Sequence, residues 1–201
     1  MGGERGLHEV LRARVGDDAA ARRLARYVAL VERWSQTHNL VRFATREELL
    51  ERHVLEPLSV VGSLAASGRL LDVGSGAGLP GVPLLVLMPG WQGVLLEPRH
   101  KRWTFLRLVI RELDLAAEAR AVRYQDYDGG GFDLVTARAV GGHAELVHWA
   151  REHLNADGKV LLWTGEEEAA RLGGLAGWRV LSSPLVGLDR GRLVCLEPCF
   201  T

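Results

Sequence analysis

The chain has 201 residues, a length that suits one α/β domain with an appendage and leaves little room for two domains. Its composition, 47% hydrophobic and 25% charged, is that of an ordinary globular protein, and a formal net charge of zero argues against a general coat for nucleic acid. No apolar run reaches the roughly 18 residues of a membrane span, and the N-terminus has no signal-peptide core, so we expect a cytoplasmic protein without a membrane partner.

The first third of the chain has a helical pattern. In residues 20–34 apolar side chains recur at spacings of three and four, which predicts an amphipathic helix. Thr45 followed by Glu48 predicts the start of a second helix, which runs to about residue 64 and is interrupted by Pro57. We therefore expect a helical N-terminal extension at residues 1–66, packed as one unit with a second part at residues 67–201.

From Gly68 onward, strand patterns alternate with helix patterns. We expect strands at residues 69–74, 91–97, 117–124, 132–138 and 158–165, and helices from about Pro80, at 100–113, around 143–154 and at 166–172. Such alternation implies a parallel sheet covered on both faces. Residues 178–198 have the pattern of two strands joined by a turn, with no helix between them. The predicted fold class is therefore α/β, with a mostly parallel sheet and an antiparallel end.

The stretch LLDVGSGAGLPGVP, residues 70–83, carries glycines at positions 74, 76, 78 and 81 directly after the first of these strands. Its GxGxxG spacing admits a dinucleotide, whereas a triphosphate loop would need a following Gly-Lys-Ser/Thr. The carboxylate of Asp72 would repel a pyrophosphate but suits a ligand that carries an ammonium and a sulfonium group. Glu97 ends the next strand, where a carboxylate can accept hydrogen bonds from both ribose hydroxyls. The pattern thus favours S-adenosylmethionine over NAD, with the loop residues Gly74, Ser75, Gly76 and Gly78 around it.

Charged residues elsewhere give weaker signals. Arg138 ends a central strand, and because a buried arginine needs a partner, we predict a functional role for it. The segment 99–111 carries five basic residues and no acid, a pattern that fits a solvated helix face as well as it fits RNA binding.

No metal site is expected. His143, His148 and His153 recur every five residues, which turns successive rings by about 140° around a helix, so they cannot share one metal. Cys195 and Cys199 suggest neither a disulfide framework nor a zinc site.

The runs DVGSGAGLPGVPL, LLEPRHKRWTFLR and TARAV strongly resemble the ribosomal RNA small subunit methyltransferase G family, also called glucose-inhibited division protein B. The motif of Trp34, Asn39 and Leu40 and the run ERHVLEPL extend the resemblance over nearly the whole chain. It implies a Rossmann-like class I S-adenosylmethionine-dependent methyltransferase that methylates guanine N7 in 16S ribosomal RNA. We expect that RNA to be presented within the 30S subunit.

The resemblance also implies roles for individual residues. Gly74 and Leu79 would contact the cofactor, Glu97 would hold its ribose, and Tyr124 with Gln125 would border its adenine. Arg138 would lie beside the transfer site. Lys101 and Arg123 match basic positions of the family, and the predicted RNA-binding residues are Arg99, Lys101, Arg102 and Arg123.

The chemistry of the residues agrees with this target. The chain lacks the Asn/Asp-Pro-Pro-Tyr/Phe run common for amine targets, and neither cysteine ends a central strand, as pyrimidine carbon-5 methylation would require. Guanine N7 has a free lone pair and needs no base to remove a proton.

Three positions differ from the usual pattern of the family. Val41 stands where the family has Thr, Glu56-Pro57 where it has Asp-Ser, and Thr164-Gly165 where it has Lys-Gly. Two alternatives therefore stay open: a methyltransferase of another RNA or a small molecule, and a ribosome-associated protein that binds the cofactor without catalysis.

Overall fold

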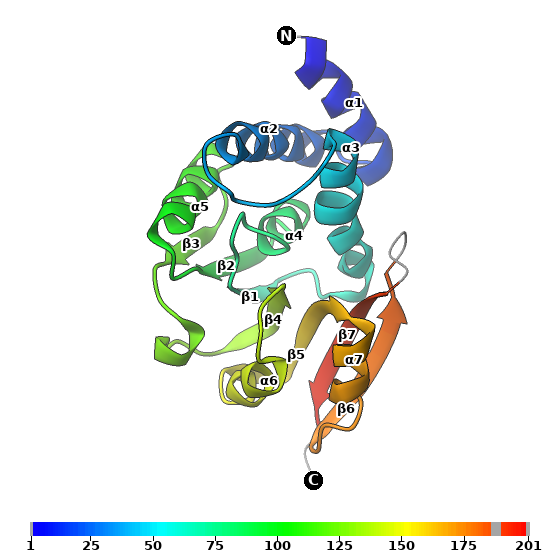
Figure 1. Ribbon diagram of the computed structural model, residues 1–201, viewed down its shortest axis with the longest axis vertical. Coiled ribbons are helices and arrows are strands. Elements are labelled where there is room, and N and C mark those ends of the chain that lie inside the picture. Colours follow the sequence, from blue (N-terminus) through cyan, green and yellow to red (C-terminus); the bar gives the residue numbers. More distant parts are fainter. Residues whose placement is uncertain (1, 186–189, 200–201) are drawn as a thin grey trace.

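Seven strands form one mixed sheet in the computed structural model, which describes residues 2–185 and 190–199 (Figure 1). Their order across the sheet is β3-β2-β1-β4-β5-β7-β6. The strands from β1 to β5 pair in parallel, and β7 runs antiparallel to both β5 and β6, which confirms the predicted antiparallel end. Part of the predicted final turn, residues 186–189, lies outside the described residues. The strands are β1 (Gly68–Val73), β2 (Trp91–Leu96), β3 (Ala117–Arg120), β4 (Phe132–Arg138), β5 (Leu154–Gly165), β6 (Trp178–Pro184) and β7 (Gly191–Pro198).

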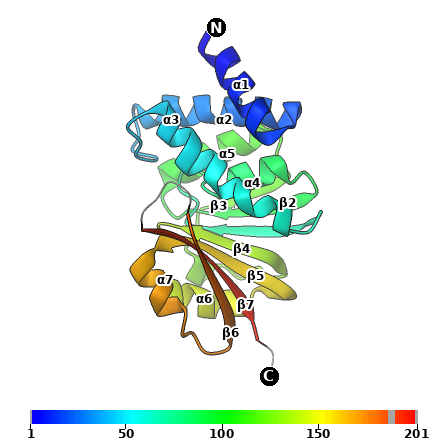
Figure 2. The same ribbon diagram turned by 90° about the vertical axis from the view of Figure 1, so that its right-hand side faces the viewer.

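Helices cover the sheet on both faces, as Figure 2 shows. The helices α2, α4 and α5 lie on one side of the sheet, and α6 and α7 lie on the other. Alternate residues of β1 serve the two cores: Leu70 packs into the core with α4 and α5, and Leu71 packs into the core with α6 and α7. Burial on both faces explains the continuous apolar runs of the central strands. The helices are α1 (Gly2–Val15), α2 (Asp18–Ser35), α3 (Arg46–Glu48), α4 (Gly81–Leu87), α5 (His100–Glu112), α6 (His143–Arg151) and α7 (Glu166–Leu172).

The amphipathic helix predicted at residues 20–34 is confirmed as α2. Asp17 caps it by accepting a hydrogen bond from the backbone N–H of Ala20, and its apolar stripe is buried. The helix packs on α4 and α5. The hydroxyl of Tyr27, which is fully buried, donates a 2.8 Å hydrogen bond to the carbonyl of Ala77 in the glycine loop. The N-terminal helices are thereby attached to the loop that the sequence singled out.

The second predicted helix, from Thr45 to about residue 64, has a different internal structure. Thr45 caps the backbone N–H of Glu48 as predicted, but α3 lasts a single turn before a π-helix at Leu49–Leu55 and a 3-10 helix at Glu56–Ser63. The helical segment is confirmed, but its π and 3-10 winding was not predicted. Pro57 accounts for the second change, from π to 3-10 winding at Glu56, because it has no N–H to continue the helical ladder; the change from α to π winding at Leu49 comes before it in the chain. The predicted interruption at Pro57 is confirmed.

Several boundaries also differ from the prediction. β3 ends at Arg120, because the chain then turns toward a 3-10 helix at Tyr124–Asp126. The helix α4 begins at Gly81, and Pro80 is its N-cap residue. β5 begins at Leu154, four residues early, where Asn155 donates to the carboxylate of Asp133 and the pairing with β4 shifts register. Among the described residues, no helix is long and apolar enough to cross a membrane.

Candidate functional site

The glycine loop leaves the carboxyl end of β1 and turns back into α4. Gly74, Gly76 and Gly78 have φ values of +67°, +57° and +92°, which confirms that the loop needs a backbone that side chains rarely adopt. A Cβ on Gly78 would lie 2.5 Å from Cγ2 of Val82, so this position has no room for one. Ser75 closes the turn, since its hydroxyl donates to the carbonyl of Asp72 at 2.9 Å.

Asp72 lies beneath the loop and is fully buried. Its Oδ1 accepts a 2.8 Å hydrogen bond from the hydroxyl of Thr136 on β4, while Oδ2 has no hydrogen-bond partner among the described residues. The Oδ2 atom lies under Gly81, where an added Cβ would approach it to 2.8 Å. Burial raises the pKa of Asp72 to about 6, and the hydrogen bond from Thr136 opposes that rise. Asp72 thus lies buried below the glycine loop and is not on the open surface of the loop.

Glu97 connects the loop to the end of β2. Its Oε2 accepts the backbone N–H of Gly76 at 3.0 Å, and its Oε1 accepts the backbone N–H of Arg99 at 2.8 Å. The residue is 3% exposed. A carboxylate has about four acceptor positions, so each oxygen retains capacity for one further donor. Two hydroxyl groups of a ribose fit that remaining capacity.

Tyr124 and Gln125 follow β3 at the same edge of the sheet. Tyr124 is half-buried and meets the ring of Trp149 edge-on, with ring centroids 5.2 Å apart, while Gln125 is exposed. Burial raises the pKa of the Tyr124 hydroxyl, with a further contribution from Glu145. The backbone N–H of Glu97 donates to the carbonyl of Arg120, so this turn begins close to the predicted ribose ligand.

Arg138 ends β4, and its side chain is only 15% exposed. Its guanidinium donates to the carboxylate of Glu56 at 3.3 Å, which supplies the partner that a buried arginine needs. The next residue, Ala139, has a φ of +55°, and the residue after it, Val140, packs against the glycine loop at Gly74. The sequence analysis named Glu56 only as a difference from the family pattern. It predicted neither the contact of Glu56 with Arg138 nor that of Val140 with Gly74, since each depends on a neighbour far away in the chain.

The four predicted basic residues divide into two groups. Arg99, Lys101 and Arg123 are exposed, and none of them pairs with a carboxylate within residues 6–185 and 190–199. Arg102 is half-buried: its Nη2 donates to the carbonyl of Asn39 at 3.1 Å, and its Nη1 lies 3.5 Å from the Cβ position of Gly76. The side chain of Arg102 therefore covers the glycine loop.

The histidines that were excluded as shared metal ligands have separate partners. His143 is buried and lies 3.3 Å from a carboxylate oxygen of Glu168, whereas His153 stacks on the ring of Trp149. His148 is exposed. In the described part of the chain, no three His, Cys, Asp or Glu side chains gather as metal ligands.

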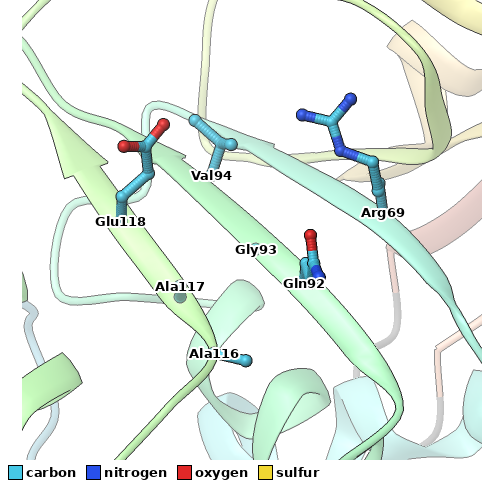
Figure 3. Close-up of a pocket in the computed structure, with 7 residues that line it drawn as sticks. All are labelled: Arg69, Gln92, Gly93, Val94, Ala116, Ala117 and Glu118. Carbon is cyan, nitrogen blue, oxygen red and sulfur yellow. The ribbon is translucent and has the colours of Figure 1, made fainter.

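Two surface pockets lie outside this arrangement. One, of about 340 Å³, is lined by Arg69, Gln92 and Ala117 among others (Figure 3), which lie within the first two residues of β1, β2 and β3. It is therefore at the opposite ends of these strands from the glycine loop. A second pocket, of about 530 Å³, lies along the loop between α2 and α3 and includes Asn39, whose carbonyl binds Arg102.

Comparison with known proteins gives a consistent result. The family model GidB, described as rRNA small subunit methyltransferase G, matches residues 20–175. The ribosomal RNA small subunit methyltransferase G of Chromobacterium violaceum is 38% identical over 177 residues, which cover 84% of each chain. The protein of the same name from Leptothrix cholodnii is 35% identical over 192 residues, which cover 90% of this chain and 88% of the relative.

Solved structures show the same fold at low sequence identity. A ribosomal protein L11 methylase from Lactobacillus delbrueckii subsp. bulgaricus superposes with a TM-score of 0.64 at 15% identity, covering 79% of this chain and 81% of that one. A SAM dependent methyltransferase from Aquifex aeolicus gives a TM-score of 0.62 at 13% identity, covering 75% and 93%. These similarities confirm the predicted Rossmann-like methyltransferase fold.

Proposed function

The chain belongs to the rRNA small subunit methyltransferase G family, and we propose that it methylates N7 of a guanine in 16S ribosomal RNA with S-adenosylmethionine as the methyl donor. The observation that carries the proposal is the carboxylate of Glu97, held by two backbone N–H groups beside the glycine loop with acceptor capacity left over. When bound, the cofactor supplies an electrophilic methyl group on a sulfonium.

We assign the cofactor site residue by residue to the loop and its neighbours. Glu97 would accept the ribose hydroxyls, and the open backbone of the loop would admit the rest of the cofactor without a side-chain collision. Asp72 would favour a cation above it through its charge. Tyr124 and Gln125 would border the adenine. The assigned loop residues are Gly74, Ser75, Gly76, Gly78 and Leu79.

The transfer itself is an in-line displacement whose main requirement is position. With the cofactor held by the loop and Glu97, the lone pair of guanine N7 would form the new bond to the methyl carbon as the carbon–sulfur bond breaks and leaves its electron pair on sulfur. The protein needs to hold the base in line and to remove no proton. Arg138 is the residue we assign to this step, because a guanidinium can donate to guanine O6 while N7 stays free.

For the RNA, we assign Arg99, Lys101 and Arg123, whose exposed charges are free to approach phosphates. Arg102, also predicted to bind RNA, is better placed to cover the glycine loop, because its guanidinium lies over Gly76. Three cations neutralise few phosphates, so the shape of the RNA has to supply much of the recognition. We therefore propose the 30S subunit or an assembly intermediate in the cytoplasm as substrate.

We also propose that residues 1–66 and 67–201 work as one unit, through contacts such as the hydrogen bond from Tyr27 to Ala77.

The proposal is tested by methyl incorporation from radiolabelled S-adenosylmethionine at matched salt. We expect much faster incorporation into 30S subunits than into protein-free 16S RNA, and mass spectrometry of the digested RNA should identify 7-methylguanosine. Equal rates on both substrates would show that the enzyme does not need the assembled particle. Incorporation only into another RNA would favour the alternative target, and cofactor binding without incorporation would favour a non-catalytic protein.

A further inference from the structure

The carboxylate of Glu56 joins the ends of two neighbouring strands at the edge of the sheet that carries the glycine loop. Its Oε2 accepts from the guanidinium of Arg138 at 3.3 Å, and its Oε1 accepts from the indole N–H of Trp163 at 2.6 Å. Arg138 and Trp163 are register partners on β4 and β5. One acid from the N-terminal helices thus holds one side chain on each of two adjacent parallel strands.

This contact is buried, which makes its charge balance important. The side chain of Glu56 is 7% exposed and that of Arg138 is 15% exposed. Burial raises the pKa of Glu56 and lowers the pKa of Arg138, and their mutual attraction opposes both changes. His53, one helical turn before Glu56, adds no charge near neutral pH, because burial and the nearby cations, Arg138 first, lower its pKa to about 4. A buried ion pair is weak evidence for stability, so its presence here calls for another reason.

We propose that Glu56 is a positioning residue for methyl transfer. It fixes the guanidinium of Arg138 beside the reacting guanine, and its carboxylate balances the charge of that guanidinium. The inference rests on the proposed function, since it assigns a second residue to the same transfer step.

The charge balance follows from the reaction. Methylation at N7 converts a neutral guanine into a cation, and an unbalanced guanidinium next to the base would oppose that change in a partly buried site. A guanidinium also needs a fixed orientation if its donors are to meet guanine O6 and leave N7 open. The carboxylate of Glu56 supplies both the counter-charge and the orientation, and the hydrogen bond from Trp163 holds the carboxylate in turn.

The arrangement involves one of the three positions where this chain differs from the pattern of its family and lies next to a second. Glu56-Pro57 stands in place of Asp-Ser, and Trp163 directly precedes the threonine that stands in place of lysine. Glutamate is one methylene longer than aspartate, and here it spans two partners on separate strands. Glu56→Asp therefore keeps the charge but is too short to hold both contacts, whereas Glu56→Gln keeps the length and removes the charge.

The test compares these two variants with a matched control on the same helical segment. Glu51→Gln breaks an exposed ion pair with Arg14 and leaves the strand ends untouched. We expect Glu56→Gln to lower kcat about tenfold to a hundredfold, because a misplaced group at the reaction centre costs that much, with the affinity for S-adenosylmethionine changed less than about twofold. Glu56→Asp should lower kcat by a smaller factor, and Glu51→Gln should leave kcat unchanged.

Two further readouts separate positioning from simple structural support. In an Arg138→Ala background, Glu56→Gln should have no additional effect on kcat, because Glu56 acts through Arg138. The indole N–H signal of Trp163, assigned with Trp163→Phe, should shift in both Glu56 variants. If Glu56→Gln does not fold, Trp163→Phe carries the test: it removes the indole N–H that Glu56 accepts, together with part of a buried ring, and should still lower kcat with cofactor affinity unchanged.

Three results would overturn the role of Glu56: an unchanged kcat, a fall in kcat that only follows the loss of folded protein, or equal effects with and without Arg138. A wild-type protein that transfers no methyl group to 30S subunits would overturn the proposed function itself. An active wild type with an equally active Glu56→Gln variant would overturn only this inference.

Discussion

Two regions at one edge of the sheet are constructed in different ways. The cofactor edge, formed by the loop at residues 74–81 and by Glu97, is held by backbone groups, with the N–H groups of Gly76 and Arg99 on one carboxylate. The transfer edge, formed by Glu56, Arg138 and Trp163, is held by side chains alone. Both lie at the carboxyl ends of parallel strands and both contain a shielded carboxylate, but Glu97 is held by two backbone N–H groups and Glu56 by two side chains.

The difference shows how one fold can keep its cofactor while its target site changes. A loop fixed by its own backbone tolerates many side chains around it but almost none at its glycines. A cluster of side chains can be altered by substitution, and Glu56-Pro57 stands where the family pattern has Asp-Ser. We therefore expect variants at either edge to leave the other edge intact, and the following predictions test that independence.

The largest effect is expected for Gly76→Val. The φ of +57° at this position costs a side chain about 1–2 kcal/mol, but its Cβ would meet nothing closer than Arg102 at 3.5 Å, so the protein should fold. Calorimetry should detect no binding of S-adenosylmethionine, while the indole signal of Trp163 stays in place. Gly62→Val is the control, since Gly62 is exposed with no heavy atom within 4 Å of its Cβ position. Binding within tenfold of wild type would place the cofactor elsewhere.

Glu97→Ala should have the next largest effect. Loss of two charge-assisted hydrogen bonds to the ribose costs roughly 3 kcal/mol or more, which is over a hundredfold in affinity. The measurement is calorimetric titration with S-adenosylmethionine, with Glu118→Ala as control, because Glu118 pairs with Arg120 on the exposed side of β3. Unchanged affinity in Glu97→Ala would rule out the ribose assignment.

Asp72→Asn should make the behaviour of the cofactor edge less dependent on pH. The pKa of Asp72 is raised by burial from 3.8 to about 6, so ionising it in the folded protein costs roughly 3 kcal/mol more than in the unfolded chain. The stability that the neutral acid contributes is fully present below pH 3.8 and is lost as the pH rises through about 6. Compared with wild type, Asp72→Asn should be equally stable near pH 4 and more stable at pH 7, by up to roughly 3 kcal/mol in urea unfolding.

The same ionisation should favour a cationic ligand. In wild type, the affinity for S-adenosylmethionine should fall as the pH drops through about 6, where Asp72 takes up its proton. In Asp72→Asn it should stay level across that range. An equal pH dependence in both proteins would assign it to another group.

The smallest effect is expected on the RNA side. Lys101→Ala should weaken binding to 30S subunits a few-fold and lower the slope of log affinity against log salt by about 0.7–0.9, the amount for one phosphate contact. Its affinity for S-adenosylmethionine should not change. Arg111→Ala is the control, because Arg111 lies near the far end of α5 and pairs with Glu112. An unchanged slope would show that Lys101 contacts no phosphate.

The geometry of the cofactor edge could be predicted because its parts lie within one stretch of sequence, from Asp72 to Arg99, where glycine spacing and strand ends give direct signals. The assignment of these residues to a cofactor stays a prediction. At the transfer edge, Arg138 could be singled out from its place at a strand end, but its partners could not, because Glu56 is 82 residues from Arg138 and 107 from Trp163, and nothing local marks an acid beside a proline as their partner. The same limit explains why the winding of the helical segment at residues 49–63 was not predicted. The cap at Thr45 and the break at Pro57 are local, but the choice of π and 3-10 winding depends on what the segment packs against.

The hydrogen bond from Tyr27 to Ala77 links α2 to the glycine loop across 50 residues of sequence. A ligand that binds the loop stabilises whatever the loop is bonded to, by the linkage of binding to local opening. We expect amide hydrogen exchange in α2 to slow when S-adenosylmethionine binds, and to slow less in Tyr27→Phe. The helix would then report the occupancy of a site to which it contributes no ligand atom.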